Sequence, residues 1–183
     1  MKVYKGVLYS LICLFFALGE ASAQSKVLNT NNKLEKRIRW YTLEEAIELN
    51  KVEKRKIVID LYTDWCGWCK VMEQNTFNDP KVINYINKRF YPVKFNAERK
   101  ESVRFNDKMY NYINSGRRGY NALALELSGG RLSFPSVIFL DEDQNIIQAI
   151  QGYIEPEKFI KIMHYFGENK YQSIPWSVYT RDR

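Results

Sequence analysis

The sequence has few residues of the kinds that bind metal ions. Its 183 residues include three cysteines, Cys13, Cys66 and Cys69, and one histidine, His164. A closed zinc site needs four ligands, commonly Cys and His, and His164 lies far along the chain from Cys66 and Cys69. We therefore expect no metal site.

Long apolar runs are also missing, except at the N-terminus. Lys2 and Lys5 precede a 14-residue apolar run, Gly6–Gly19, and an Ala-Ser-Ala tripeptide then ends at residue 23. A membrane-spanning helix needs about 20 apolar residues, whereas this shorter pattern is typical of a secretory signal peptide. We therefore predict a signal peptide over residues 1–23, cleaved near Ala23. The mature protein should be periplasmic or secreted, with no stable membrane insertion.

Neither sign of charge dominates the sequence strongly. There are 28 Lys and Arg residues against 21 Asp and Glu residues, which gives a formal charge of +7. Basic residues cluster over 33–39, 51–56 and 99–118, but acidic residues are mixed among them. Such mixed stretches are typical of solvated faces. In the absence of a nucleic-acid motif, we expect no nucleic-acid partner.

Internal repeats and low-complexity tracts are absent, so one domain is expected. The polar, Asn- and Lys-rich residues 24–39 indicate a flexible leader. The domain should cover residues 40–167. The tail over 168–183 contains several aromatic residues and should pack back on the domain rather than bind a partner.

Capping signals and apolar periodicity predict alternating helices and strands. Thr42 and Glu45 form a capping box, and Asp79-Pro80 starts another helix. The expected helices begin near Thr42, span 67–77, begin at 79, span 104–112 and 122–127, and run from Pro156 to Gly167. The expected strands cover 57–62, 90–95, 136–140 and 146–150, the last two as a hairpin.

The most informative stretch is the cysteine pair in Trp65-Cys66-Gly67-Trp68-Cys69-Lys70, between the first strand and a helix. A thiol at a helix N-terminus has a lowered pKa, because backbone N–H groups and the helix dipole stabilise the thiolate. Cys66 should therefore be the attacking nucleophile and Cys69 the resolving thiol. Cys13 leaves with the signal peptide, and a loop this short stabilises little as a crosslink. The pair is better explained by reactivity.

The sequence resembles the thioredoxin superfamily, in particular exported thioredoxin-like proteins and the periplasmic C-terminal domain of the DsbD-type thiol:disulfide interchange protein. The resemblance rests on residues 57–70, 76–82 and 134–136. It implies an α/β thioredoxin fold, with a central mixed sheet flanked by helices and an added N-terminal helix. An insertion of about 20 residues, near 99–120, precedes the cis-Pro strand. We expect it to lengthen a helix near the active site and to select clients.

Asp60 interrupts an otherwise apolar strand, and burying a carboxylate costs free energy unless it has a partner or a task. The resemblance implies that Asp60 is a general base for Cys69, with a raised pKa and with Lys94 as its partner. The alternative is an Asp at the strand end with Lys94 reaching solvent.

Pro135 opens the strand 136–140, at the one position where a core strand tolerates proline. The resemblance implies that this proline is cis and that Phe134, Pro135 and Ser136 contribute to client binding, although the family commonly has Thr after the proline. Trp65 and Trp68 should form an apolar rim around Cys66. Together with Gly67 they are expected to contribute to client binding. Ordinary packing is the alternative for the two tryptophans.

These features together predict an exported thiol–disulfide oxidoreductase that reduces protein disulfides. It needs no cofactor besides its own Cys66–Cys69 disulfide. Its partners should be exported client proteins with disulfides, and a membrane thiol relay should donate electrons, because export leads to an oxidising compartment. The alternative is a thioredoxin-fold binding or chaperone-like module without redox turnover.

Overall fold

The computed structural model describes residues 35–181 of the chain. The predicted signal peptide, Cys13 and residues 24–34 of the predicted leader lie outside the described residues. Within them the helices are α3 (Leu43–Val52), α4 (Gly67–Asn75), α5 (Pro80–Arg89), α6 (Ala122–Leu127), α7 (Pro156–Gly167), the 3-10 helix η1 (Lys170–Gln172) and α8 (Trp176–Tyr179). The strands are β1 (Lys56–Tyr62), β2 (Phe90–Asn96), β3 (Val103–Phe105), β4 (Lys108–Tyr110), β5 (Tyr112–Ile113), β6 (Tyr120–Asn121), β7 (Ser136–Leu140) and β8 (Ile146–Gln151).

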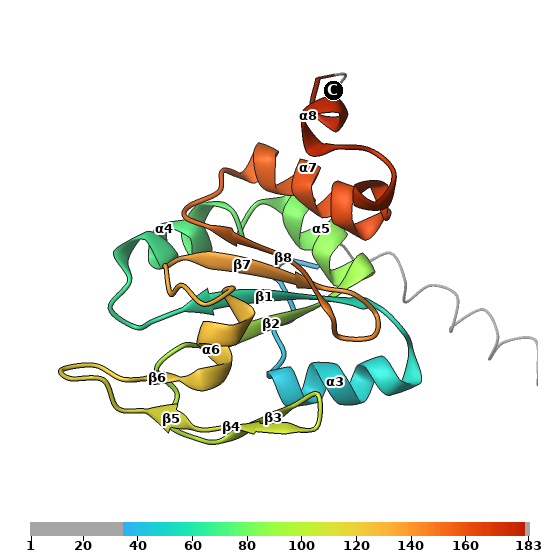
Figure 1. Ribbon diagram of the computed structural model, residues 1–183. Coiled ribbons are helices and arrows are strands. Elements are labelled where there is room, and N and C mark those ends of the chain that lie inside the picture. Colours follow the sequence, from blue (N-terminus) through green and yellow to red (C-terminus); the bar gives the residue numbers. More distant parts are fainter. Residues whose placement is uncertain (1–34, 182–183) are drawn as a thin grey trace, which may run out of the picture. The chain divides into compact units, whose positions relative to one another are not determined.

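Four strands form the central sheet, in the order β2-β1-β7-β8. β1 pairs with β2 in parallel and with β7 antiparallel, and β7 pairs with β8 antiparallel. The sheet is therefore mixed, as predicted. Helices α4, α5 and α7 cover one face, and α3 and α6 lie on the other (Figure 1).

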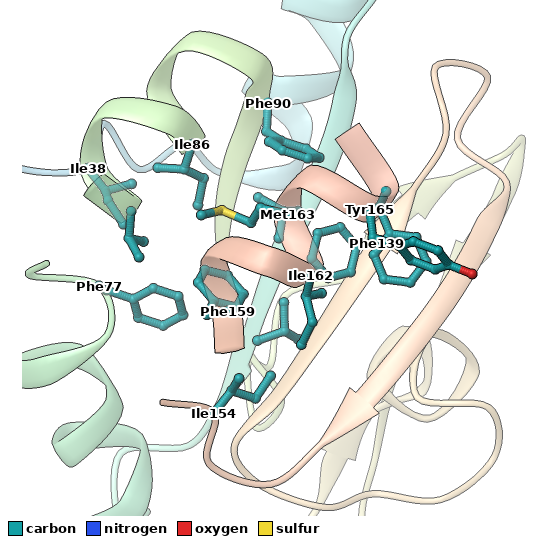
Figure 2. Close-up of a cluster of buried hydrophobic side chains, with 14 of the residues drawn as sticks. Ile38, Phe77, Ile86, Phe90, Phe139, Ile154, Phe159, Ile162, Met163 and Tyr165 are labelled. Carbon is teal, nitrogen blue, oxygen red and sulfur yellow. The ribbon is translucent and has the colours of Figure 1, made fainter. Parts of the chain in front are cut away.

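Side-chain alternation along β1 divides the core into two clusters. Val58 points into the cluster beneath α4, α5 and α7, while Ile57 and Ile59 point into the cluster beneath α3 and α6. Because successive residues of a strand face opposite sides, Asp60 shares the face of Val58. The first cluster is rich in aromatic rings, with Phe77, Phe90, Phe139, Phe159 and Tyr165 among its members (Figure 2). The predicted active-site helix therefore rests on a densely packed face.

The prediction of a helix over 104–112 is wrong. The segment forms the β3–β4 hairpin and the start of a second hairpin, β5–β6. Val103 and Phe105 are buried while Arg104 between them is exposed, which is the two-residue period of a strand. Asn106 and Asp107 both have positive φ angles, as a tight two-residue turn requires. The insertion thus adds hairpins to the domain and does not lengthen a helix.

Both ends of the described segment contact the domain. Ile38, which the sequence assigns to the leader, is buried in the first cluster, and the backbone N–H of Arg39 donates to Asn87 of α5 at 3.0 Å. At the other end Tyr179 of α8 is buried in the same cluster, with its ring 5.0 Å from that of Tyr165. Aromatic packing holds this part of the tail against α7.

Candidate active site

Cys66 and Cys69 form a disulfide at the junction of β1 and α4. Cys66 is the N-cap residue of α4, and the backbone N–H of Cys69 points at its Sγ at 3.0 Å. A donor in this position stabilises a thiolate on Cys66 once the disulfide is reduced. Both cysteines are largely buried, with 4% and 7% of their surface exposed. Access to the sulfurs is therefore narrow, and their neighbours decide what reaches them.

Three charged side chains, from β1, β2 and α4, lie in contact with one another. Asp60 Oδ2 lies 3.4 Å from the Lys94 ammonium, which also lies 3.0 Å from Glu73 of α4. Asp60 and Lys94 are direct neighbours in the β1–β2 register. The Lys94 ammonium also lies 5.0 Å from the centre of the Tyr62 ring. The structure therefore joins the predicted pair and links it to the helix that carries Cys69.

Burial raises the pKa of Asp60 to about 6, against an ordinary value of 3.8. Desolvation is the largest cause, Lys94 opposes it, and the negative charge of Glu73 adds to it. Only 3% of Asp60 is exposed, and its Oδ1 has no hydrogen-bond partner within residues 35–181. A buried carboxyl with one unsatisfied oxygen and a pKa near neutrality is suited to exchanging protons.

Phe134 and Pro135 directly precede β7, and Phe134 packs on Trp65, the residue before Cys66. Their peptide bond is cis, as the resemblance implies. The Phe134 ring meets the Trp65 ring edge-on, with centroids 5.9 Å apart. Ser136 is buried, pairs with Leu61 of β1, and its hydroxyl donates to the Ser133 carbonyl at 2.6 Å. β7 pairs with its neighbours from Ser136 onward, so the Phe134 backbone precedes the ladder.

The family model for the thioredoxin-like domain matches residues 43–167, a range that includes every site residue described above. The chain belongs to the thioredoxin-like family. The thiol:disulfide interchange protein DsbD of Pectobacterium atrosepticum is 28% identical over 105 residues, covering 56% of this chain and 15% of that protein. The DsbD of Vibrio vulnificus is 33% identical over 60 residues, covering 33% of this chain and 10% of its own length. The chain therefore spans only a small part of the relatives it matches.

Solved structures support the same fold. A DsbH oxidoreductase superposes with a TM-score of 0.54 at 14% identity, covering 76% of this chain and 91% of its own. A putative disulphide-isomerase from Bacteroides thetaiotaomicron gives a TM-score of 0.51 at 22% identity, covering 75% of this chain and 94% of its own. These similarities confirm the predicted thioredoxin fold.

The two tryptophans that flank the cysteines are exposed. The exposed fraction of Trp65 is 51% and that of Trp68 is 63%. The Trp68 ring leans on Tyr153, with centroids 5.6 Å apart. Gly67 lies between them, and a Cβ built on it would meet no atom within 4 Å. The surface at Gly67 is therefore open.

Sequence reasoning missed several residues of the site. Glu73 lies four positions after Cys69 in the same helix, a spacing that places two side chains on one face, so it was open to prediction. Glu98 accepts a hydrogen bond from Trp65 Nε1 at 2.8 Å. The guanidinium of Arg118, from the β5–β6 loop, lies 4.3 Å from the centre of the Trp65 ring. Nothing in the sequence pairs Glu98 or Arg118 with Trp65, because the contacts depend on the path of the insertion.

Over residues 35–181, no three His, Cys, Asp or Glu side chains are grouped closely enough to hold a metal ion. In the same part of the chain, no helix combines the length and apolar character needed to cross a bilayer.

Proposed function

We propose that the protein is an exported thiol–disulfide oxidoreductase that reduces disulfides in client proteins through Cys66 and Cys69. One observation carries the proposal: the two cysteines form a disulfide at the start of α4, and the Lys94–Glu73 contact links that helix to the buried Asp60 carboxyl. The match to the thioredoxin-like domain and the partial similarity to DsbD proteins support it. The signal-like N-terminus supports export.

The reaction begins with the reduced protein. The Cys66 thiolate attacks one sulfur of a client disulfide, a new Cys66–client disulfide forms, and the second client sulfur leaves as a thiolate. The N-terminus of α4 and the Cys69 backbone N–H stabilise the attacking thiolate. The leaving client thiolate takes a proton from solvent.

The second step releases the client. Asp60 accepts the proton of the Cys69 thiol, and the Cys69 thiolate attacks Cys66 Sγ. The Cys66–Cys69 disulfide forms, and the first client sulfur leaves as a thiolate that takes up the proton. Two electrons have then passed from the protein to the client. The pKa of Asp60, about 6, leaves it ionised and ready to accept that proton near pH 7.

The rim residues suit the binding of an extended client segment. The Phe134 backbone precedes the β7 ladder, so a client strand can pair with it next to Cys66. Trp65, Trp68 and Phe134 supply apolar surface for client side chains. Since the cysteines are largely buried, a client disulfide has to enter between these rings.

The turnover requires an electron donor, because each cycle leaves the protein oxidised. In an oxidising compartment, a membrane thiol relay of dithiols is the chemical class that fits. Such a relay would attack the Cys66–Cys69 disulfide by the same exchange in reverse. The partial similarity to DsbD proteins supports a donor of this class.

Insulin reduction tests the proposal. With dithiothreitol as electron source, the protein should accelerate precipitation of the insulin B chain, and Cys66→Ser should abolish the acceleration. Ser173→Ala, which changes an exposed tail residue away from the disulfide, should retain it. An equal, buffer-like rate for the wild type and Cys66→Ser would favour a binding or chaperone-like module, whose exposed tryptophans hold clients without redox turnover.

A further inference from the structure

Arg118 gives the site a charged edge that the insertion brings in. Its guanidinium lies 4.3 Å from the centre of the Trp65 ring, in a cation–π arrangement. Trp65 directly precedes Cys66 and packs edge-on against Phe134. The β5–β6 loop and the β1–α4 loop extend on the same side of the domain (Figure 1). A residue far from Cys66 in sequence therefore contacts the residue that directly precedes Cys66.

The hairpin that carries Arg118 is held at its base. Gly119 is buried, and a Cβ there would collide with the Tyr112 ring and the Ile113 carbonyl. The backbone N–H of Asn121 donates to Ala97, just after β2, at 2.7 Å. The Asn121 side chain donates to the Glu101 carbonyl at 3.0 Å. These contacts fix where the loop leaves the domain and thus the side on which Arg118 lies.

The Arg118 side chain is exposed and, within the part of the chain that the structure describes, has no acidic partner. Among residues 35–181, no carboxylate forms an ion pair with it, whereas Arg99 pairs with Glu44 at 3.2 Å and Lys108 with Glu126 at 3.1 Å. An arginine that stacks on an aromatic ring keeps its in-plane N–H donors free, and these match a carboxylate in two-point geometry. The side chain is therefore oriented by Trp65 and open to an incoming anion.

Contacts with Glu98 and Phe134 position the Trp65 ring, and Arg118 lies over one of its faces. Its indole N–H donates to Glu98 at 2.8 Å, and the Phe134 ring abuts it at 5.9 Å. Glu98 thus satisfies the indole at its edge while Arg118 occupies the ring face. A client segment that pairs beside Phe134 would pass along this face, with its side chains near the guanidinium.

We propose that Arg118, stacked on Trp65, forms a carboxylate-binding subsite that selects client disulfides flanked by an Asp or Glu side chain. The inference rests on the proposed reductase function and adds a substrate class to it. Lys-flanked disulfides meet a like charge at the same place and are disfavoured. Discrimination by one exposed charge amounts to about threefold to fivefold in kcat/KM, because an exposed ion pair contributes modestly in water.

Two synthetic peptides with one intramolecular disulfide test the subsite. They differ only in a Glu or a Lys two residues from the cysteine, and kcat/KM is measured for each with dithiothreitol as donor. The wild type should prefer the Glu peptide about threefold to fivefold, and 0.5 M salt should reduce the preference. Arg118→Ala should bring the ratio close to one, and Arg118→Glu should invert it.

Arg104→Ala is the matched control. It removes the same charge from an exposed position on β3, which lies away from the tip of the β5–β6 loop (Figure 1). This variant should keep the wild-type ratio, which separates a local subsite from the net positive charge of the protein.

The outcomes distinguish the two claims. If the wild type reduces both peptides equally, or if Arg118→Ala lowers both rates without changing their ratio, the subsite is overturned and the reductase function stands. If Arg104→Ala changes the ratio as much as Arg118→Ala does, the preference comes from net charge and the subsite is again overturned. If the wild type reduces neither peptide nor insulin, the proposed function fails, and the inference fails with it.

Discussion

The Lys94 ammonium lies 3.4 Å from Asp60, too far to neutralise fully a carboxyl that is only 3% exposed. Lys94 is also shared with Glu73, at 3.0 Å. Burial therefore outweighs the ion pair, and the pKa of Asp60 is raised. The ionised Asp60 carboxyl therefore lowers the stability of the fold and can accept a proton, and both effects can be measured.

Replacing Asp60 by Asn should stabilise the protein at neutral and alkaline pH. The folded-state pKa, about 6, lies above the ordinary 3.8, so the contribution of Asp60 to stability is fully present below about pH 4 and is lost as pH rises through about 6. A shift of this size corresponds to about 2 to 3 kcal/mol. Urea unfolding of Asp60→Asn should therefore match the wild type near pH 4 and exceed it by up to that amount at pH 8. A loss of stability at pH 8 would contradict the raised pKa.

The ionisation of Asp60 should also set the pH at which the rate of insulin reduction changes. Below about pH 6, Asp60 is protonated and cannot accept the Cys69 proton, so the rate should fall there. Glu73→Gln removes a negative charge that raises the pKa of Asp60, so the inflection should move to lower pH. Glu48→Gln provides the control, because Glu48 is an exposed residue of α3, and it should leave the pH profile unchanged. If the inflection stays at the same pH or moves to higher pH in Glu73→Gln, the charge of Glu73 does not raise the pKa of Asp60.

The roles of the two cysteines predict an asymmetric trapping result. Without Cys69 the mixed disulfide has no resolving thiol, so Cys69→Ser should accumulate Cys66–client adducts, seen as reductant-sensitive bands on non-reducing gels. Cys66→Ser should accumulate none, because Cys66 and not Cys69 occupies the N-cap of α4, where backbone N–H groups stabilise a thiolate. Equal trapping by the two variants would overturn the assignment of Cys66 as the nucleophile.

Where local patterns decide the structure, the sequence is sufficient. The apolar strand 57–62, the capping box at Thr42 and the Asp79-Pro80 helix start all appear at the predicted places. Each depends on neighbours within a few residues, or on burial of both strand faces. The pairing of Asp60 with Lys94 came from family resemblance, and the β1–β2 register accounts for it.

The insertion is where local reasoning failed. Residues 104–112 contain enough helix-compatible side chains to suggest a helix, but the alternation of Val103, Arg104 and Phe105 and the turn at Asn106 indicate a hairpin. The contact of Arg118 with Trp65 joins residues 53 positions apart in sequence. No periodicity reports such a contact, because it depends on the three-dimensional path of both loops.

A glycine substitution at Gly119 tests the packing of that insertion, and one at Gly67 in α4 serves as the comparison. Gly119→Ala places a Cβ against the Tyr112 ring and the Ile113 carbonyl, so β5–β6 has to shift, at a cost of about 1 to 3 kcal/mol. Gly67→Ala has open space at the same atom and lies in the first turn of α4, so it should be neutral or slightly stabilising. Urea unfolding followed by tryptophan fluorescence measures both. Similar stability of the two variants would contradict the close approach at Gly119.

The redox potential of the Cys66–Cys69 pair, measured at equilibrium against glutathione, tests the reductive direction most directly. The dipeptide between the cysteines contains no histidine, Lys70 follows the pair as in thioredoxins, and the acidic residues Asp60 and Asp64 lie close in sequence and disfavour a very stable thiolate. We predict a potential of about −200 to −270 mV, in the range of glutaredoxins and thioredoxin. A value near −120 mV, that of the strong oxidant DsbA, would make the protein an oxidase and contradict the account.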